Sequence, residues 1–347
     1  MNVSNISFVL NNGVKDKIFP GAALSVSIDG APLYQTAVGK YTYDDNSSAI
    51  STSTIFDIAS VTKTIVATAA LKLLELGKIK LEGTIGEYLP QFTGTNVGSR
   101  ITIWNLFTHT SSLDVRMSHL ASDAICKEAI IKALTAYNTK LEPGIEVKYG
   151  NVNTFLLGEI IATVSGTPLD TFIRSEVTDV LQMNDTRYVP SLDIVDRIAP
   201  TEIEGGVTIR GVVHDPSARS IGGIAGHAGL FSTISDLNNF LTMWTEGGIF
   251  NGRQVLAQDT VNLAFTNTTR TLNKSYGLGW HLDNPDYLGH ITPVGTFFHT
   301  GFTGTIIAGN VLRKIKIVFL SNCTFPHREN HHNKNEFFRK LFDSIFS

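Results

Sequence analysis

Several residue classes that mark common kinds of protein are scarce in this sequence. Charged residues make up only 17% of its 347 positions, and the formal charge is −3. Because nucleic-acid binding requires many basic residues to neutralise phosphates, we expect no nucleic-acid partner. Apolar residues reach 42%, which excludes a fully disordered chain, since disorder requires low hydrophobicity and high charge.

Cysteine is almost absent, and no stretch of the sequence is apolar enough to cross a membrane. Cys126 and Cys323 lack the spacing of a metal motif or a disulfide framework, so we interpret them as buried free thiols. A membrane-spanning helix needs about 18 apolar residues in a row, and no such run occurs. The start of the chain lacks the basic and apolar segments of a secretory signal. If Met1 is the natural start, we therefore expect a cytoplasmic protein.

Signature motifs of several enzyme classes are missing too. The sequence contains no Gly-x-Ser-x-Gly, no phosphate-binding loop ending in Gly-Lys-Ser/Thr and no His-Glu-x-x-His. His327, His331 and His332 lie in a polar stretch without acidic or thiol partners in a recognisable pattern, so we interpret them as solvated. We interpret His109 and His227 as structural. The sequence thus predicts neither a metal nor an organic cofactor.

Strand patterns lie near the two ends of the chain. Apolar and polar residues alternate over 24–28, an Asp-Gly turn follows at 29–30, and 33–38 reads as the second strand of a hairpin. Residues 305–310 and 314–322 are two further β-rich runs, separated by a short basic turn. Both ends of the chain therefore predict strands of one sheet.

The middle of the chain is mostly helical. The stripe that follows Ser60 has helical spacing and ends before Gly77; its members are Val66, Ala69, Leu73 and Leu76. A second helix begins near Asn151, and a third is capped by Ser232 or Thr233. Phe337, Leu341 and Ile345 show the same spacing in a last helix at residues 336–346.

This pattern predicts an α/β (α+β) fold with one sheet built from both termini. We assign the sheet domain to residues 1–59 and 271–347, and the inserted, mostly helical domain to residues 60–270.

Ser60 and Lys63 form the only Ser-x-x-Lys of the chain, at the start of the first predicted helix. Side chains three residues apart lie on one helix face, so the lysine amine can take or share the serine proton. The partial positive charge at a helix N-terminus favours the alkoxide. The alternative is that Ser60 merely caps the helix and Lys63 is solvated.

Two further motifs follow in order along the chain. Tyr149 and Asn151 form its only Tyr-x-Asn, and His299-Thr300-Gly301 comes after an aromatic strand. Ser-x-x-Lys, Tyr-x-Asn and a basic residue with Thr-Gly, in this order, resemble the serine β-lactamase and penicillin-binding protein family. The similarity is greatest to its class C-like branch, which includes DD-peptidases, D-aminopeptidases and family VIII esterases. It extends over segments 19–23, 56–60, 101–103, 106–113, 181–186, 226–233, 276–280 and 299–305.

The resemblance implies a β-lactamase/transpeptidase-like fold, with an antiparallel sheet flanked by helices and the active site at the domain interface. It also implies that Ser60 is the nucleophile and that Lys63 and Tyr149 accept and transfer the proton of its hydroxyl group. A free tyrosine has a pKa of about 10, and a cationic Lys63 nearby would favour the phenolate. Which of the two groups acts as the general base stays open. Asn151 would orient Lys63 and bind the substrate amide, or act as a helix N-cap.

The resemblance places the substrate along residues 299–302. Backbone N–H groups of Ser60 and Phe302 would form the oxyanion hole, Thr300 would help bind the substrate, and Gly301 would allow close approach. His299 departs from the lysine that penicillin-targeted members usually have. A histidine is mostly neutral at pH 7, which favours ester or amide substrates. The alternative is that a nearby carboxylate keeps His299 protonated and able to bind anions.

The sequence therefore predicts a serine hydrolase that acts through an acyl-enzyme on Ser60. Its partner would be a small-molecule or short-peptide substrate, namely an ester, an amide or a D-amino-acid peptide. The alternatives are a penicillin-binding DD-peptidase, a class C-like β-lactamase and a non-catalytic acyl-binding protein.

Overall fold

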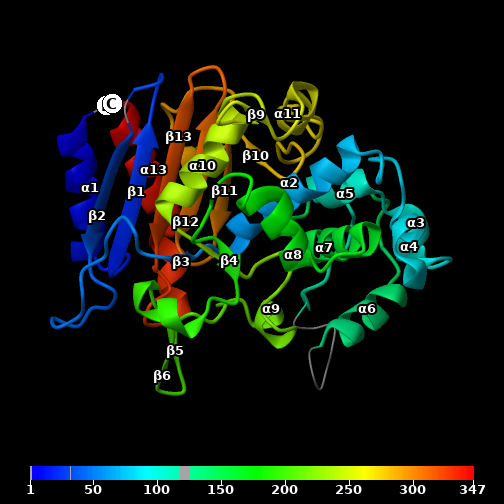
Figure 1. The fold of residues 1–347 in the computed structure, drawn as a ribbon, viewed down its shortest axis with the longest axis horizontal. Coiled ribbons are helices and arrows are strands. Elements are labelled where there is room, and N and C mark those ends of the chain that lie inside the picture. The colour runs from blue at the N-terminus through cyan, green and yellow to red at the C-terminus, as the bar shows by residue number, and fades with distance from the viewer. Residues whose placement is uncertain (1, 32, 118–125) are drawn as a thin grey trace.

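The fold is that of a computed structural model, which describes residues 2–31, 33–117 and 126–347. A six-stranded sheet with helices on both faces occupies one side of the molecule, and a mostly helical region lies beside it (Figure 1). Within the described ranges, no helix has the length and hydropathy of a membrane span.

The sheet joins the two ends of the chain, as the sequence predicts. Its strand order is β10-β11-β12-β13-β1-β2, and every neighbouring pair is antiparallel. The strands are β1 (Gly21–Ser27), β2 (Tyr34–Gly39), β10 (His281–Leu282), β11 (Phe297–Gly301), β12 (Thr305–Asn310) and β13 (Ile315–Ser321). The predicted hairpin and the two predicted C-terminal strands are therefore confirmed. The motif 299–301, expected after the aromatic strand, lies within β11 itself.

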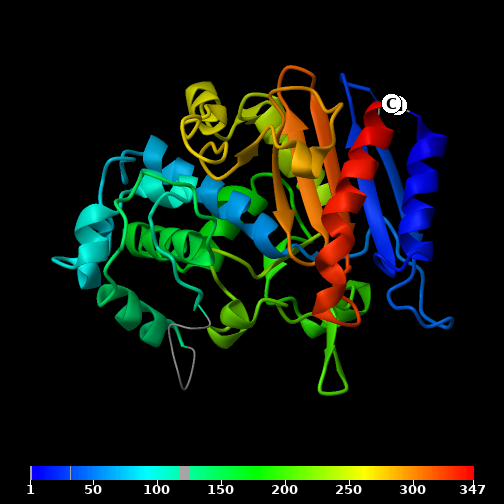
Figure 2. The same ribbon diagram turned by 180° about the vertical axis from the view of Figure 1, so that it is seen from behind.

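Helices cover both faces of this sheet. α1 (Val3–Lys15) and α13 (Lys334–Phe346) lie on one face and α10 (Ile234–Thr245) on the other (Figure 1, Figure 2). Successive strand residues point to opposite faces, so Leu24 of β1 belongs to the core under α1 and α13, while Ala23 belongs to the core of the helical region. Burial on both faces explains why these strands are rich in apolar residues.

The helical region is built around α2 (Thr62–Glu75) and α7 (Asn151–Ser165), which pack against each other. The other helices are α3 (Ile85–Tyr88), α4 (Asn96–Arg100), α5 (Ile103–Thr108), α6 (Lys127–Thr135), α8 (Leu169–Ile173), α9 (Pro216–Ser220), α11 (Gln258–Phe265) and α12 (Pro285–Leu288). Short strands connect them: β3 (Phe56–Asp57), β4 (Arg187–Tyr188), β5 (Glu202–Glu204), β6 (Val207–Ile209), β7 (Leu230–Ser232), β8 (Ile249–Phe250) and β9 (Arg253–Gln254).

The observed fold class matches the sequence-based expectation. The domain division at residues 59/60 and 270/271 stays a prediction. α10 falls in the predicted helical segment but packs against β12 and β13 of the sheet.

Some local details differ from expectation. α2 is buried on nearly all sides rather than along one stripe, because it lies in the middle of the helical region. Leu76, expected on that stripe, is 66% exposed at the helix end, where Gly77 adopts a φ of 64° and stops the helix.

The cysteines agree only in part with the prediction of two buried free thiols. Cys126 is half-buried, whereas Cys323 is buried as expected; both are free. The cap of α10 is Thr233, whose hydroxyl accepts a hydrogen bond from the Asp236 amide.

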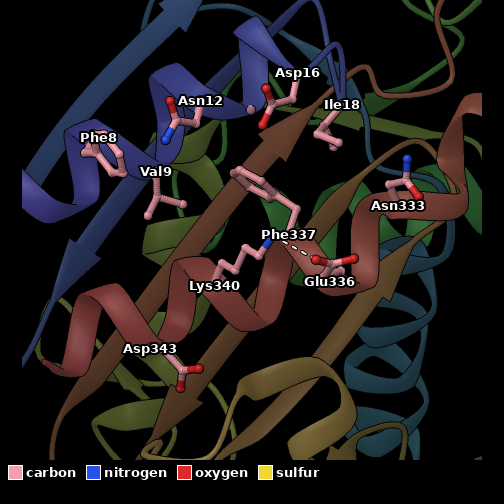
Figure 3. A pocket seen from close by; sticks show the side chains of 11 residues that line it. Phe8, Val9, Asn12, Asp16, Ile18, Asn333, Glu336, Phe337, Lys340 and Asp343 are labelled. Atoms are coloured by element: carbon pink, nitrogen blue, oxygen red, sulfur yellow. Dashed lines mark ion pairs between the residues drawn. The ribbon is translucent and has the colours of Figure 1, made fainter.

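A cavity of about 620 Å³ lies between α1 and α13 (Figure 3). Phe8 and Phe337 contribute apolar surface to it, and an ion pair of 2.7 Å joins Lys340 and Glu336 along α13. None of the residues predicted for the active site lines this cavity.

Candidate active site

Ser60 lies on a short helical turn directly after the buried strand β3. A 3-10 turn spans Ala59–Val61, and α2 then begins at Thr62. The N-cap residue of α2 is Val61, and no side chain caps it. The alternative in which Ser60 serves only as a helix cap is therefore wrong.

The Asp57 carboxylate holds this turn in shape. It accepts hydrogen bonds of 2.8 Å from the Ala59 amide and 2.7 Å from the His214 amide. Ala59 has a φ of 46°, which is strained for a residue with a Cβ atom and needs such support. Burial raises the pKa of Asp57 to about 6, although both hydrogen bonds act in the opposite direction. Asp57 therefore fixes the backbone immediately before Ser60.

Lys63 is buried beside the Ser60 hydroxyl. Only 1% of the residue is exposed, so the alternative of a solvated lysine is wrong. Its Nζ donates hydrogen bonds to Ser60 Oγ at 2.9 Å, Asn151 Oδ1 at 3.0 Å and the His227 carbonyl oxygen at 2.8 Å. Burial lowers the pKa of Lys63 to about 7, while the negative charge of Asp215 acts in the opposite direction. The amine thus changes its charge near neutral pH.

Asn151 connects Lys63 to a carboxylate that the sequence analysis did not single out. Asn151 is the first residue of α7, whose N-cap is Gly150, so the interpretation of Asn151 as an N-cap is wrong. Its Nδ2 donates a 3.2 Å hydrogen bond to Asp215 Oδ2. Burial acts to raise the pKa of Asp215, but hydrogen bonds outweigh burial and hold the pKa well below its usual value. Asp215 is therefore an anion on the far side of Asn151 from Lys63.

The hydrogen bonds that keep Asp215 ionised come from its own loop. His227 Nε2 lies 3.3 Å from Oδ1, and the Ser217 hydroxyl and the Ala218 amide also donate to this oxygen. Burial lowers the pKa of His227, so its imidazole ring is a neutral hydrogen-bond donor to Asp215. His227, interpreted from the sequence as structural, contacts the site through both its carbonyl oxygen and its ring.

Tyr149 lies above Ser60 and Lys63. Its ring centroid is 5.2 Å from Lys63 Nζ, and the nearby Ser60 hydroxyl acts to lower the pKa of the Tyr149 phenol. The residue is 37% exposed overall, yet desolvation of its phenol group raises the pKa of Tyr149 well above its usual value. The lowering of the pKa by Ser60 offsets only part of this effect. The net direction is thus opposite to the stabilisation of the phenolate that we expected from a cationic Lys63.

Three histidine rings surround Tyr149. The centroid distances are 4.7 Å to His109, 5.9 Å to His281 and 6.0 Å to His299. Tyr276 extends the cluster, since its hydroxyl lies 2.9 Å from His281 Nε2. His109, interpreted from the sequence as structural, is thus in direct ring contact with a predicted site residue.

His299 is buried and neutral. Burial, together with the charges of His281 and Lys63, holds the pKa of His299 well below its usual value. Its Nδ1 lies 2.9 Å from the Thr300 carbonyl oxygen, which can only accept a hydrogen bond. The ring proton is therefore on Nδ1, and Nε2 keeps a free lone pair. The alternative of a protonated His299 beside a carboxylate is wrong.

The strand β11 runs directly alongside the turn that carries Ser60. The Thr303 hydroxyl donates a 2.7 Å hydrogen bond to the Asp57 carbonyl oxygen. A Cβ atom at Gly301 would come within 2.6 Å of the Ile58 carbonyl oxygen, so only glycine permits this approach. The structure thus brings Phe302, which follows β11, next to the turn that carries Ser60.

An open cleft of about 700 Å³ adjoins Tyr149 and Asn151, the neighbours of the Ser60–Lys63 pair, which itself does not line the cleft. Tyr149, Asn151, Asp215 and Phe302 are among its lining residues. Besides Asp215, the charged side chains on its walls are Asp114, Arg116, Lys148 and Arg328. No group of three histidine, cysteine, aspartate or glutamate side chains in the described residues is arranged to hold a metal ion.

The structure brings the predicted residues together, but the sequence analysis missed Asp57 and Asp215. The dipeptide Asp215-Pro216 is a helix-start signal, and Asp215 does cap α9. That local signal predicts a cap only. Nothing in the sequence shows that the same carboxylate reaches Asn151, 64 positions away.

Fold and site together place a half-buried serine beside a buried lysine, next to strand β11 of an antiparallel sheet. Residues 9–337 match the beta-lactamase family, so the chain belongs to this family and is a hydrolase of the β-lactamase and penicillin-binding type. This confirms the resemblance seen in the sequence.

Individual relatives carry several names. A protein of Escherichia coli O157:H7, named "Putative D-alanyl-D-alanine carboxypeptidase", is 28% identical over 90% of this chain and 80% of its own length. Among solved structures, EstCE1, a hydrolase with promiscuous acyltransferase activity, has a TM-score of 0.80 at 19% identity, covering 99% of this chain and 98% of its own. A class C β-lactamase also has a TM-score of 0.80 at 19% identity, covering 99% and 96%. These structures support the fold.

Proposed function

We propose that this protein cleaves a small ester, amide or D-amino-acid peptide through an acyl-enzyme on Ser60. The observation that carries the proposal is the set of three partners around Lys63 Nζ. Two of them, Asn151 Oδ1 and the His227 carbonyl oxygen, can only accept hydrogen bonds. A neutral amine has two N–H donors and one lone pair. In that neutral state the lone pair replaces the N–H that the ammonium form donates to Ser60 Oγ, and it faces this oxygen at 2.9 Å, which is the geometry of a general base.

The pKa values support the assignment of this role to Lys63. Burial brings the pKa of Lys63 to about 7, so a large fraction of the amine is neutral at physiological pH. Burial moves the pKa of Tyr149 in the direction that keeps the phenol protonated. Lys63 then accepts the Ser60 proton, Tyr149 donates its own proton to the leaving group, and the Lys63 ammonium returns a proton to Tyr149, so both groups end the step in their starting states.

The backbone around Ser60 supports an oxyanion hole. When Ser60 Oγ attacks the acyl carbonyl, the carbonyl electron pair moves onto oxygen, and that oxygen needs hydrogen-bond donors. We assign the amides of Ser60 and Phe302 to this task. Asp57 and Gly301 support the assignment, because one shapes the turn before Ser60 and the other lets β11 lie close to it.

The neutral state of His299 supports a substrate without a carboxylate at this position. Its Nε2 offers a hydrogen-bond acceptor, and its ring carries no positive charge. We therefore favour neutral esters and amides. Thr300 and Gly301 line the same strand and complete the binding edge for the substrate.

Replacement of the nucleophile tests the proposal. We expect Ser60→Ala to reduce hydrolysis of a p-nitrophenyl ester by at least about 10³-fold, as expected when a nucleophile is removed. Ser53→Ala, which changes an exposed serine of the same segment, should retain full activity. Mass spectrometry should find the acyl group on the peptide that contains Ser60. Unchanged hydrolysis by Ser60→Ala would refute the proposal.

A DD-carboxypeptidase is the second candidate, because relatives that match most of this chain carry that name. Exposure to penicillin separates the candidates. A long-lived adduct on Ser60 identifies a penicillin-binding DD-peptidase, rapid turnover identifies a β-lactamase, and no adduct identifies the esterase or amidase. Binding without turnover of any substrate identifies a non-catalytic acyl-binding protein.

A further inference from the structure

We propose that Lys334 is a positioning residue of the oxyanion hole, in which its ammonium group fixes and polarises the peptide between Gly301 and Phe302. This inference rests on the proposed acyl-enzyme function. It assigns a role to a side chain that comes from the opposite end of the chain from Ser60 and belongs to none of the sequence motifs.

The location of Lys334 is unfavourable for a lysine in two respects. It is the first residue of α13, where the helix dipole disfavours a positive charge. It is also half-buried, and burial lowers the pKa of its amine. In the described part of the chain, no acidic side chain lies within ion-pair distance of it, unlike Lys340 on the same helix. Some other interaction must therefore hold this amine in place.

Two backbone carbonyls provide that interaction. Lys334 Nζ donates hydrogen bonds to the Gly301 oxygen at 3.2 Å and to the Phe302 oxygen at 3.1 Å. The amine also lies 4.9 Å from the centroid of the Phe302 ring, within the range of a cation–π contact. The three contacts all lie on Gly301, the last residue of β11, and on Phe302, which follows it.

The chemistry of the peptide bond connects these contacts to the reaction. The Gly301 carbonyl and the Phe302 N–H belong to the same peptide group. A positively charged donor on the carbonyl oxygen draws electron density from the nitrogen, so the N–H becomes a stronger donor. The Gly304 amide also donates to the Gly301 oxygen, at 3.3 Å, so this peptide is held in one orientation. The Phe302 N–H is thus aimed and strengthened before the substrate arrives.

Lys334→Met tests the proposal, because methionine has a similar length but no charge or N–H. We expect kcat/KM for a p-nitrophenyl ester to fall about 10-fold through kcat, with KM unchanged, because the developing oxyanion exists only in the transition state. This loss is smaller than the 10²- to 10³-fold that is typical when an oxyanion-hole donor is removed outright. Lys334→Arg, which retains the charge and the donors, should recover most of the rate.

A spectroscopic readout distinguishes this role from a merely structural one. The carbonyl stretch of the Ser60 acyl-enzyme reports hydrogen-bond strength in the oxyanion hole, and Lys334→Met should shift it to higher frequency. Lys340→Met, which removes an exposed lysine of the same helix, is the matched control and should leave both the rate and the frequency unchanged.

Two measurements keep the outcome decisive. Burst titration of active sites and the unfolding midpoint show whether Lys334→Met folds. Rates are compared per active site. If Lys334→Met does not fold, Lys334→Arg and Lys334→Gln are compared with each other instead. A well-folded variant with wild-type kcat and an unshifted carbonyl frequency would overturn the inference. If the wild-type protein forms no acyl-enzyme on Ser60, the proposed function fails first, and the role of Lys334 fails with it.

Discussion

The side-chain amide of Asn151 donates a 3.2 Å hydrogen bond to Asp215, and this contact determines which end of the amide faces Lys63. With Nδ2 occupied by the carboxylate, Oδ1 is directed to the lysine amine at 3.0 Å. Asp215 therefore acts on Lys63 in two ways: it orients an acceptor for the amine, and its negative charge stabilises the ammonium form.

Asp215→Asn should change the pH dependence of the reaction. Because the charge of Asp215 raises the pKa of Lys63, its removal lowers that pKa, and the acid limb of the kcat/KM profile should move to lower pH. The maximal rate should also fall, by about 10-fold, because Asn151 loses its anchor. Asp29→Asn, at an exposed ion pair in the hairpin turn, is the control and should keep the wild-type profile. An unmoved acid limb in Asp215→Asn would contradict this account.

Tyr149→Phe should separate the two candidates for the general base. We expect kcat to fall by about 10²-fold, because a proton donor is lost, while the acid limb near pH 7 remains, because it belongs to Lys63. Stopped-flow measurement of the pH–rate profile checks both parts. Tyr34→Phe, in the edge strand β2, serves as the control. Disappearance of the acid limb in Tyr149→Phe would assign the base to the phenol instead.

His299→Lys should change substrate preference. A lysine adds a positive charge at a position that is neutral in this protein. A charge-assisted hydrogen bond contributes about 1.5–3 kcal/mol, so the ratio of kcat/KM for a penicillin to that for a neutral ester should rise by about 10-fold or more. His290→Lys, at an exposed loop residue, adds the same charge elsewhere and should leave the ratio unchanged. An equal ratio in both variants would show that position 299 does not select substrates by charge.

Asp57 should make the protein less stable as the pH rises. Burial raises its pKa from 3.8 to about 6, so the folded state binds the proton more tightly than the unfolded state does. The free energy of unfolding should therefore decrease between about pH 4 and pH 6 through this group, by up to about 3 kcal/mol, and level off above pH 6.

Urea unfolding of Asp57→Asn at several pH values checks this effect. Other carboxyl groups contribute to the pH dependence in both proteins, so the informative quantity is the difference between wild type and variant. That difference should change between pH 4 and pH 6. A constant difference across this range would show that Asp57 does not titrate there. We also expect Asp57→Asn to lose activity at pH 7, because an asparagine accepts only one of the two amide hydrogen bonds.

Several features of this protein can be predicted from local sequence patterns. The hairpin of β1 and β2 follows from alternating apolar residues and an Asp-Gly turn, and α7 and α10 follow from apolar residues at helical spacing. Ser60 and Lys63 were recognisable because three positions on a helix bring side chains to one face. The three motifs identified the family because their order along the chain is specific to it.

Other features depend on contacts between distant segments, which no local pattern reports. Asp215 reaches Asn151 from a loop 64 positions later, and Lys334 reaches Gly301 from the C-terminal helix. The charge states of Lys63 and His299 belong to this group as well. A pKa depends on burial and on neighbouring charges, and both exist only after the chain has folded.

The amino-acid sequence by itself thus determined the secondary structure at both ends and the family, and it predicted a set of candidate reactive residues. Each of these is carried by residue types and spacing, which are local properties. Only the tertiary structure decided how those residues are charged, aimed and supported, because desolvation and hydrogen bonding at the site come from segments that meet in space.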